Sequence, residues 1–218
     1  MSALHTRLLN HLRSGDVRAR VDDWLRPASA LEAITAASYS HPNGFRKLVL
    51  EEGQDGTKLR VHHWLATGTP RTSNVHNHRW SFASAIIVGA LRSSWLTVAD
   101  DGEELQRYAF EPAAAGERHT LTPSGSAALA VTQLAEFRPG SSYVVTADQL
   151  HKIEARPGTI SLMLSGPAER GRTDVYRPFE APTQPRLQVP LTASEIRDTL
   201  EDLRAGLDGA DVMSRIVS

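Results

Sequence analysis

The chain has 218 residues, and its 24 Lys and Arg against 25 Asp and Glu give a formal net charge of −1. This near-neutral balance argues against an electrostatic nucleic-acid or membrane-surface binder. Cysteine is absent, which excludes disulfides, iron–sulfur clusters, cysteine-ligated zinc and a cysteine nucleophile. A metal site would have to use carboxylates or some of the nine histidines.

The N-terminal segment is predicted to be helical. Leucines at helical spacing predict a helix over residues 3–13, and a second helix is expected over 17–25, where Pro27 ends it. A third helix is expected to run up to about Tyr39. These elements form a helical N-terminal extension, residues 1–40, which we expect to pack on the outside of a β core.

The same N-terminus argues against targeting to a membrane. Its sequence, MSALHTRLLNHLRSGD, is interrupted by charged residues and lacks the apolar core of a signal peptide. The longest apolar stretch, around residues 83–91, is too short to span a bilayer. We therefore expect a cytoplasmic protein with no membrane partner.

Residues 41–180 have the pattern of a β domain. A turn is expected at Asp100–Gly102. Short strands separated by turn signals are typical of a sandwich or barrel. The predicted strands are FRKLVLE, KLRVHHWL, VHNHRWSFASAIIVG, ALRSSWLTV, LQRYAFEP, HTLTP, AVTQLAEF, SYVVTA, HKIEA and TISLML.

A tail follows over residues 181–218 and carries a C-terminal helix. Thr192 and Glu195 have the spacing of a capping box, which predicts that this helix starts at Thr192. Apolar residues at helical spacing then predict a buried face for it.

Three histidines are candidate metal ligands. His76 and His78 are separated by one residue on a predicted strand, so alternation should point both imidazoles to the same face. His151 follows much later, at the start of another predicted strand, and a jelly roll can bring it across the barrel to the first pair. Histidines at this spacing can also be a solvent-exposed strand pair, which is the alternative.

The residues around the first pair resemble a known motif. Residues 76–89 read HNHRWSFASAIIVG, which looks like the first cupin motif: two histidines one residue apart, an acid and a glycine. His76, His78 and Gly89 match this motif, whereas Phe82 stands at the acid position.

Residues 140–155 are similar to the second cupin motif, in spacing more than in identity. Gly140 and His151 match, whereas Thr146, Asp148 and Ala155 replace the motif's proline, glycine and asparagine. Together the two motifs imply a mainly β fold, a cupin jelly roll (double-stranded β-helix), with N-terminal helices and a C-terminal helix.

Within the cupins, the sequence most resembles the cysteine-dioxygenase type of 3-His non-haem iron cupin. That resemblance implies one Fe(II) bound by His76, His78 and His151 and reacting with O2. Ser161 matches the serine of that family's last core strand, but Met163 takes the place of its histidine. Zn, Ni or Mn are alternative cofactors, since imidazole suits several metals.

Further residues are candidates for the substrate pocket on strand alternation or on their position in the motifs: His62, Trp64, Phe82, Arg92 and Met163. A tryptophan at such a position is more often a core aromatic, and a solvated strand residue is the favoured alternative for the arginine. No residue is assigned a catalytic role from the sequence.

The sequence and its resemblance together predict a dioxygenase-like, non-haem Fe(II)-dependent oxygenase. Three neutral imidazoles leave the charge of a divalent ion uncompensated, so a small polar or anionic metabolite and O2 are the expected partners. The alternatives are a Zn- or Ni-dependent cupin isomerase, lyase or hydrolase, and a non-catalytic metabolite-binding cupin. By analogy with cupins that pair through edge strands, a homodimer is also possible.

Overall fold

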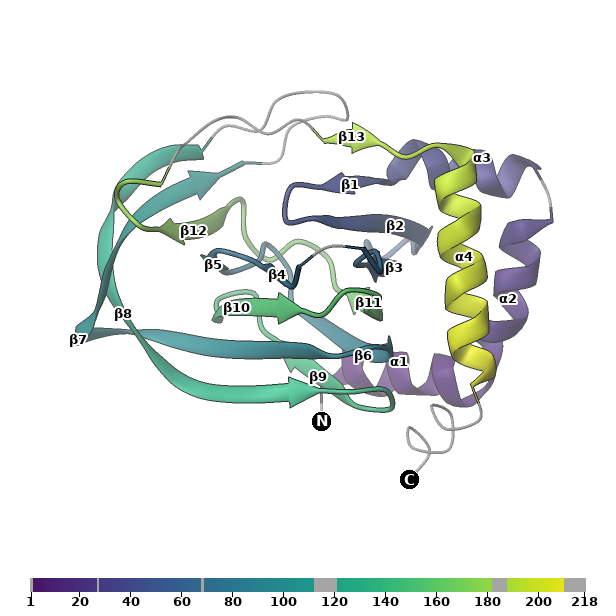
Figure 1. Cartoon of the computed structure of the whole chain (residues 1–218), viewed down its shortest axis with the longest axis horizontal. Helices are drawn as coiled ribbons and strands as arrows, with labels where there is room; N and C mark the ends of the chain where they lie inside the picture. Colours follow the sequence, from purple (N-terminus) through teal and green to yellow (C-terminus); the bar gives the residue numbers. More distant parts are fainter. Residues whose placement is uncertain (1, 27, 68, 112–120, 182–187, 210–218) are drawn as a thin grey trace.

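The computed structural model describes the chain except for residues 1, 27, 68, 112–120, 182–187 and 210–218. In the described part, the strands form one seven-stranded and one six-stranded sheet, here called sheet A and sheet B. All of the strand pairings are antiparallel. Three helices, α1 (Ala3–Arg13), α2 (Asp16–Leu25) and α4 (Ala193–Asp208), gather at one end of the molecule (Figure 1). Two long strands, β7 (Leu91–Phe110) and β8 (Leu121–Phe137), curve around the other end. The protein has the predicted mainly β fold, built from two antiparallel sheets, with helices at both ends of the chain.

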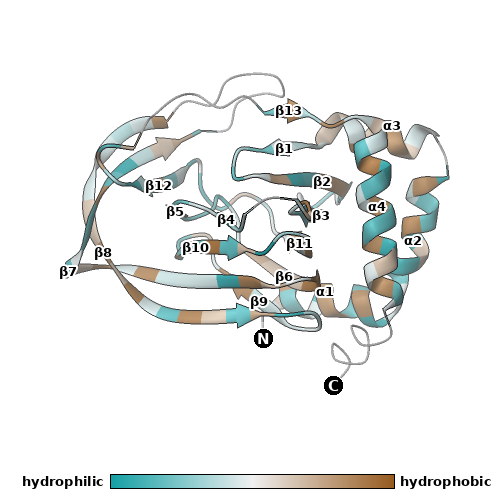
Figure 2. Cartoon of the chain, viewed as in Figure 1, coloured by the Kyte–Doolittle hydropathy of each residue, from teal (hydrophilic) through white to brown (hydrophobic). Residues whose placement is uncertain are grey.

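The helices lie close to their predicted positions. They are α1 (Ala3–Arg13), α2 (Asp16–Leu25), α3 (Ala28–Ala37) and α4 (Ala193–Asp208). The predicted capping box is present, because Thr192 and Glu195 each accept a hydrogen bond from the other's backbone N–H. Hydrophobic and hydrophilic residues alternate along α4, as its amphipathic pattern requires (Figure 2). None of the described helices is long and apolar enough to cross a membrane.

Sheet A contains, in spatial order, β13 (Val189–Pro190), β1 (Tyr39–His41), β2 (Phe45–Glu52), β3 (Lys58–His63), β11 (Ile160–Ser165), β6 (Phe82–Val88) and β9 (Ser142–Val145). Its two faces have different neighbours because successive side chains alternate. Leu162 belongs to the cluster packed against the helices. Met163 belongs to the inner cluster, with Trp64, Phe82 and Ile86. The helices therefore cover the outer face of sheet A, as predicted, and leave the inner face for the site.

Sheet B contains β4 (Arg71–Thr72), β10 (Leu150–Ala155), β5 (Val75–His76), β12 (Thr173–Arg177), β7 (Leu91–Phe110) and β8 (Leu121–Phe137). The strands β7 and β8 are longer than predicted, since each spans two of the predicted strands. Leu129 pairs with both Val98 and Glu103, so the predicted turn at Asp100–Gly102 is a bulge within a continuous ladder. The first two residues of the predicted strand HTLTP lie outside the described residues.

The glycine of the first motif has a structural reason. Gly89 has φ = 79°, in the left-handed region, at the connection between β6 and β7. A side chain there would place its Cβ 2.8 Å from Thr159 Cα. Both the conformation and the close approach of the backbone therefore require glycine.

Candidate metal centre

The structure brings the three predicted ligands together. His76 ends β5, His151 lies in β10, and these two residues are direct partners in the antiparallel ladder. His78 lies two residues after His76, beyond the end of β5. One ring nitrogen from each histidine can be chosen so that all three lie within 4.8 Å of one another. Among the described residues, this is the only cluster of three or more His, Asp or Glu side chains with metal-binding geometry.

One part of the sequence prediction is wrong: His76 and His78 do not lie on a single strand. The predicted strand VHNHRWSFASAIIVG is divided into β5 and β6, and residues 77–81 form an irregular connection. The backbone explains this division. Asn77 N–H donates to Asp174 O at 3.1 Å, whereas His78 N–H donates to Ala147 O at 3.2 Å. The neighbouring residues Asn77 and His78 are thus hydrogen-bonded to two different segments, which ends the strand at His76. The convergence of the imidazoles therefore does not come from strand alternation.

The ring nitrogens show how the imidazoles are oriented. His76 Nδ1 donates to the carbonyl of Asn74 at 2.8 Å, which leaves Nε2 of His76 with a lone pair. The Nε2 atoms of His78 and His151 lie 2.8 Å apart. His151 is buried, and its Nδ1 has no hydrogen-bond partner. A backbone acceptor therefore fixes one ring, as is typical of histidines that bind metals.

Burial keeps the three imidazoles neutral. It lowers the pKa of His76 below its ordinary value of 6.5. Burial and then the neighbouring histidines lower the pKa values of His78 and His151 well below 6.5. Neutral imidazoles have the lone pairs that a divalent ion needs, and three of them suit iron, zinc, nickel or copper. The donor set thus fits a metal ion.

Phe82 forms an apolar wall beside this cluster. The ring is 1% exposed, and its centroid lies 4.9 Å from that of His78 and 6.0 Å from that of His151. This is the position at which the first cupin motif has an acid. Because an apolar ring replaces that acid, a divalent ion held by the three imidazoles would keep its full positive charge and open positions.

The imidazoles lie on the wall of a cavity of about 1070 Å³ between the inner faces of the sheets. Four of the predicted pocket residues line this cavity: His62, Trp64, Phe82 and Met163. The ring of Phe45 lies 4.6 Å from that of His62 and 4.9 Å from that of Trp64. The cavity therefore has one aromatic wall, and its volume suits a small metabolite.

Arg92 does not line the cavity, contrary to the sequence prediction. It is exposed on β7, and its guanidinium lies 3.8 Å from the carboxylate of Glu136. Leu91 and Ser93 on either side of it are buried. Strand alternation therefore points Arg92 out of the molecule.

The sequence prediction missed the positive charge of the cavity. One acidic side chain, Glu52, is among the described residues that line it, and it pairs with Lys58 at 2.8 Å. The basic residues that line it are Lys47, Lys58, Arg60, Arg79 and Arg177. A signal for one of them was present in the sequence, since Arg60 shares a strand face with His62 and Trp64, which were candidates.

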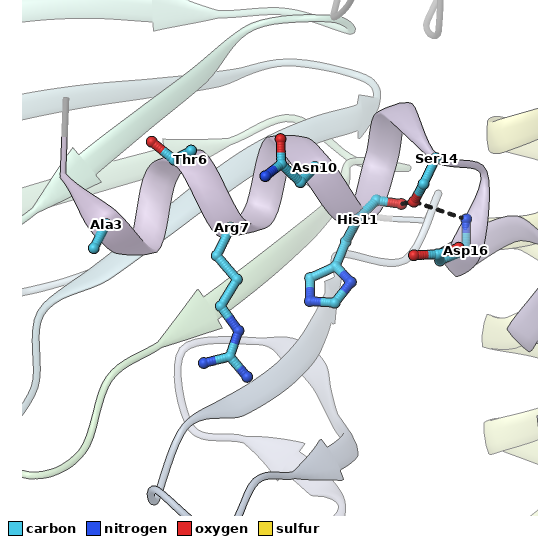
Figure 3. Close-up of a pocket in the computed structure, with 7 residues that line it drawn as sticks. All are labelled: Ala3, Thr6, Arg7, Asn10, His11, Ser14 and Asp16. Carbon is cyan, nitrogen blue, oxygen red and sulfur yellow. Dashed lines mark hydrogen bonds between the residues drawn. The ribbon is translucent and has the colours of Figure 1, made fainter.

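A second depression lies far from this chemistry. It has a volume of about 540 Å³ and follows the surface of α1 (Figure 3). Its one arginine, Arg7, is paired with Asp55 at 3.0 Å. The depression adds no cluster of metal-binding or nucleophilic side chains to those already described.

Three solved structures show what the chain is similar to. No protein-family model matches the sequence, and no curated protein matches it. The hydroquinone 1,2-dioxygenase PnpCD, solved with Cd2+ and 4-hydroxybenzonitrile, is 16% identical with a TM-score of 0.34, over 54% of this chain and 61% of that one. An RmlC-like cupin from Shewanella frigidimarina is 14% identical with a TM-score of 0.33, over 61% and 85%. An oxalate oxidase is 15% identical with a TM-score of 0.38, over 79% and 76%. At such low similarity, substrate and metal have to be inferred from the residues of this chain.

Proposed function

We propose that this protein is a non-haem Fe(II)-dependent oxygenase that acts on a small anionic metabolite. One observation supports this proposal most. Three neutral imidazoles converge, with no carboxylate in their cluster, on a cavity whose described lining has several basic side chains and one acidic side chain, Glu52. Such a site attracts an anion and leaves room for it beside the ion.

The three histidines would hold the ion through neutral nitrogens. Bound there, Fe(II) would supply the redox chemistry with O2 that the protein's own side chains lack. His76 is oriented for this role by its hydrogen bond to Asn74 O. The choice of iron among the metals that imidazole suits rests on the resemblance of the sequence to 3-His iron cupins.

The other cavity residues would bind the substrate and exclude water. Phe82, Trp64 and Met163 are at most 6% exposed and form apolar surface around the imidazoles. Lys47 and Arg60 come from adjacent strands of sheet A, β2 and β3, and present positive charge to the same cavity. A low-dielectric wall beside fixed charges strengthens their attraction for an anion.

An oxygen-electrode experiment tests the proposal. The protein is loaded anaerobically with Fe(II) or with Zn(II), and O2 uptake is measured with a panel of small mono- and dicarboxylates. We expect uptake by the iron form with at least one of these anions, and none by the zinc form or by a His151→Gln variant treated with Fe(II) in the same way. Turnover of a panel member by the zinc form without O2 would instead favour a hydrolase, lyase or isomerase. No Fe(II) binding, or no uptake with any of the anions, would contradict the proposal.

A further inference from the structure

Three cationic side chains surround one indole ring in the cavity. The guanidinium carbon of Arg60 lies 4.6 Å from the Trp80 ring centroid, and that of Arg79 lies 5.1 Å from it. Lys47 Nζ lies 5.9 Å from the same centroid. We call Lys47, Arg60 and Arg79 the Trp80 cation cluster. All four residues line the cavity that contains the imidazoles.

The hydrogen bonds of this cluster go to neutral groups. Lys47 Nζ donates to the Tyr39 hydroxyl at 2.9 Å, and Arg60 Nη1 donates to Ser165 Oγ at 2.7 Å. Within the described part of the chain, no ion pair involves a member of the Trp80 cation cluster. Cations that are withdrawn from solvent are ordinarily paired with an anion. Among the residues that the structure describes, none supplies that anion to this cluster.

Two donors in this region, one on Arg60 and one on Trp80, have no partner among the described residues. Arg60 is 4% exposed, and its Nε–H makes no hydrogen bond. The indole Nε1–H of Trp80 is also buried without an acceptor. The acid that faces this region, Glu52, forms its ion pair with Lys58. Buried donors without acceptors are rare in folded proteins, and here they indicate the place of a bound acceptor.

The positive charges of the cluster repel one another. Burial, followed by the charges of Arg60, Lys58 and Arg79, lowers the pKa of Lys47 well below its ordinary value. Burial also lowers the pKa of Arg60 to about 10. An anion bound among these groups would offset the repulsion between the cations and would accept the hydrogen bonds that the buried donors lack.

We propose that the substrate carries two anionic groups, as a small dicarboxylate does, and that the Trp80 cation cluster binds the one remote from the metal centre. The Trp80 ring lies 6.3 Å from the His78 ring, so a molecule a few atoms long can reach from one cluster to the other. Only the place of the first anionic group, at the ion, rests on the proposed function. The second group is placed by residues that do not bind the metal.

Isothermal titration tests this inference without any turnover. Succinate and succinamate have the same length, but succinamate has one negative charge fewer. We expect the zinc-loaded protein to bind succinate at least about tenfold more tightly, because a charge-assisted hydrogen bond is lost with the amide. In Arg60→Met and Arg79→Met, the affinity for succinate should fall to that for succinamate. Two variants are needed because Arg60 is buried and its replacement can unfold the protein. Arg92→Met removes an equivalent charge outside the cavity and should change neither affinity.

The outcomes separate this inference from the proposed function. Equal binding of succinate and succinamate by the wild type, or a preference that survives in both variants, would overturn the dianion inference even if the iron form consumes O2. We expect the metal-free wild-type protein to bind sulfate, and we expect the metal-free Arg79→Met variant to lose this binding. That result would support the cation cluster as an anion site even if Fe(II) fails to bind, which would contradict only the proposed function.

Discussion

His78 and His151 have Nε2 atoms 2.8 Å apart in a site where burial keeps both imidazoles neutral. At this distance, one ring has to donate a proton to the other, or two lone pairs repel each other. A divalent ion accepts both lone pairs at once. The pair of rings, completed by Nε2 of His76, therefore favours an ion over a purely structural contact.

The first prediction concerns His78, which belongs to no strand. His78→Ala should abolish stoichiometric metal binding, because two imidazoles alone hold a divalent ion weakly. Most of the fold should remain, since the sheets do not depend on this side chain. Metal analysis and thermal unfolding of the purified variant measure both effects. His11→Ala, on α1, is the control and should bind metal normally; an unfolded His78→Ala protein would mean that the site is structural.

The second prediction concerns Phe82 and the charge of the site. In Phe82→Glu, a carboxylate beside His78 should increase metal retention and compete with anions, because it adds a negative ligand. The affinity of the metal-loaded variant for succinate should therefore fall. Phe82→Gln introduces a polar side chain of the same size as glutamate but without its charge. It should therefore weaken anion binding less than Phe82→Glu does. If Glu and Gln variants bind succinate equally, charge at this position does not control the site.

The third prediction concerns the pH dependence contributed by His62. Burial, followed by the charge of Lys47, lowers the pKa of His62 well below 6.5. Above pH 6.5, His62 is neutral in the folded and the unfolded chain, and the full free energy of unfolding is present. As the pH falls below that value, the unfolded chain takes up a proton that the folded chain excludes, so the free energy of unfolding decreases. His62→Phe keeps a ring in contact with Phe45 but cannot titrate.

Urea unfolding of the metal-free proteins at about pH 7.5 and about pH 5 measures this difference. The wild type should lose more of its free energy of unfolding between the two pH values than His62→Phe does. An equal loss in both proteins would show that His62 is protonated in the folded state. His11→Phe gives the comparison, because burial lowers the pKa of His11 on α1 less than that of His62, so this replacement should change the pH dependence less.

At the residue scale, the metal ligands could be predicted from the sequence more reliably than the charged residues of the cavity. The three histidines could be predicted because their spacing is a local signal that a known motif shares. Lys47 could not be recognised as a cavity residue in the same way, because lysine usually lies on the solvated face of a strand. For Arg60, the signal was its alternation with His62 and Trp64. Arg92 was a candidate because a guanidinium can bind a carboxylate in bidentate fashion, but alternation with the buried Leu91 and Ser93 points it outward.

At the scale of elements, the connection between β5 and β6 positions the metal centre. Asn77 lies between two of the ligands and is 3% exposed. Its side-chain Nδ2 donates to Asp174 Oδ2 at 3.1 Å, and the backbone N–H of Asp174 donates to Asn77 Oδ1 at 2.7 Å. This reciprocal pair joins the connection to β12. Asn77 is thus a positioning residue for His76 and His78.

The fourth prediction is that Asn77→Ala loosens this connection. The buried carboxylate of Asp174 loses a donor, which should cost about 1–3 kcal/mol in the free energy of unfolding. The affinity for Zn(II) should fall as well, because both neighbouring ligands lose their support. Asn10→Ala, on the surface of α1, is the control. Reduced stability with unchanged metal affinity would show that Asn77 supports the fold but does not position the ligands.

The helices could be predicted more accurately than the strands. Helix signals are local: leucines at helical spacing and the Thr192–Glu195 capping box lie within single elements. Strand limits depend on which distant segment supplies the hydrogen bonds. The division between β5 and β6 follows from backbone partners at Ala147 and Asp174. The continuity of β7 across its bulge likewise depends on pairing with β8, which no local pattern indicates.

At the scale of the whole molecule, charge is distributed unevenly. The chain is close to neutral, with a formal net charge of −1, yet the described lining of its large cavity contains one acidic residue and several basic ones. Many acids lie elsewhere in ion pairs, such as Asp22 with Arg18 and Arg204. Overall composition therefore concealed the property that is most informative about the substrate. The possible homodimer stays a prediction, which sedimentation velocity tests.

The central claim is that three imidazoles of this chain bind one divalent ion. X-ray absorption at the metal edge, combined with elemental analysis of anaerobically purified protein loaded with Fe(II), tests it most directly. The account predicts one ion per chain and three imidazole nitrogens at about 2.0–2.2 Å, with oxygen ligands from solvent completing the set. Binding should be lost in His76→Ala, His78→Ala and His151→Ala alike. A substoichiometric ion, or an ion with fewer than three imidazole ligands, would contradict the claim.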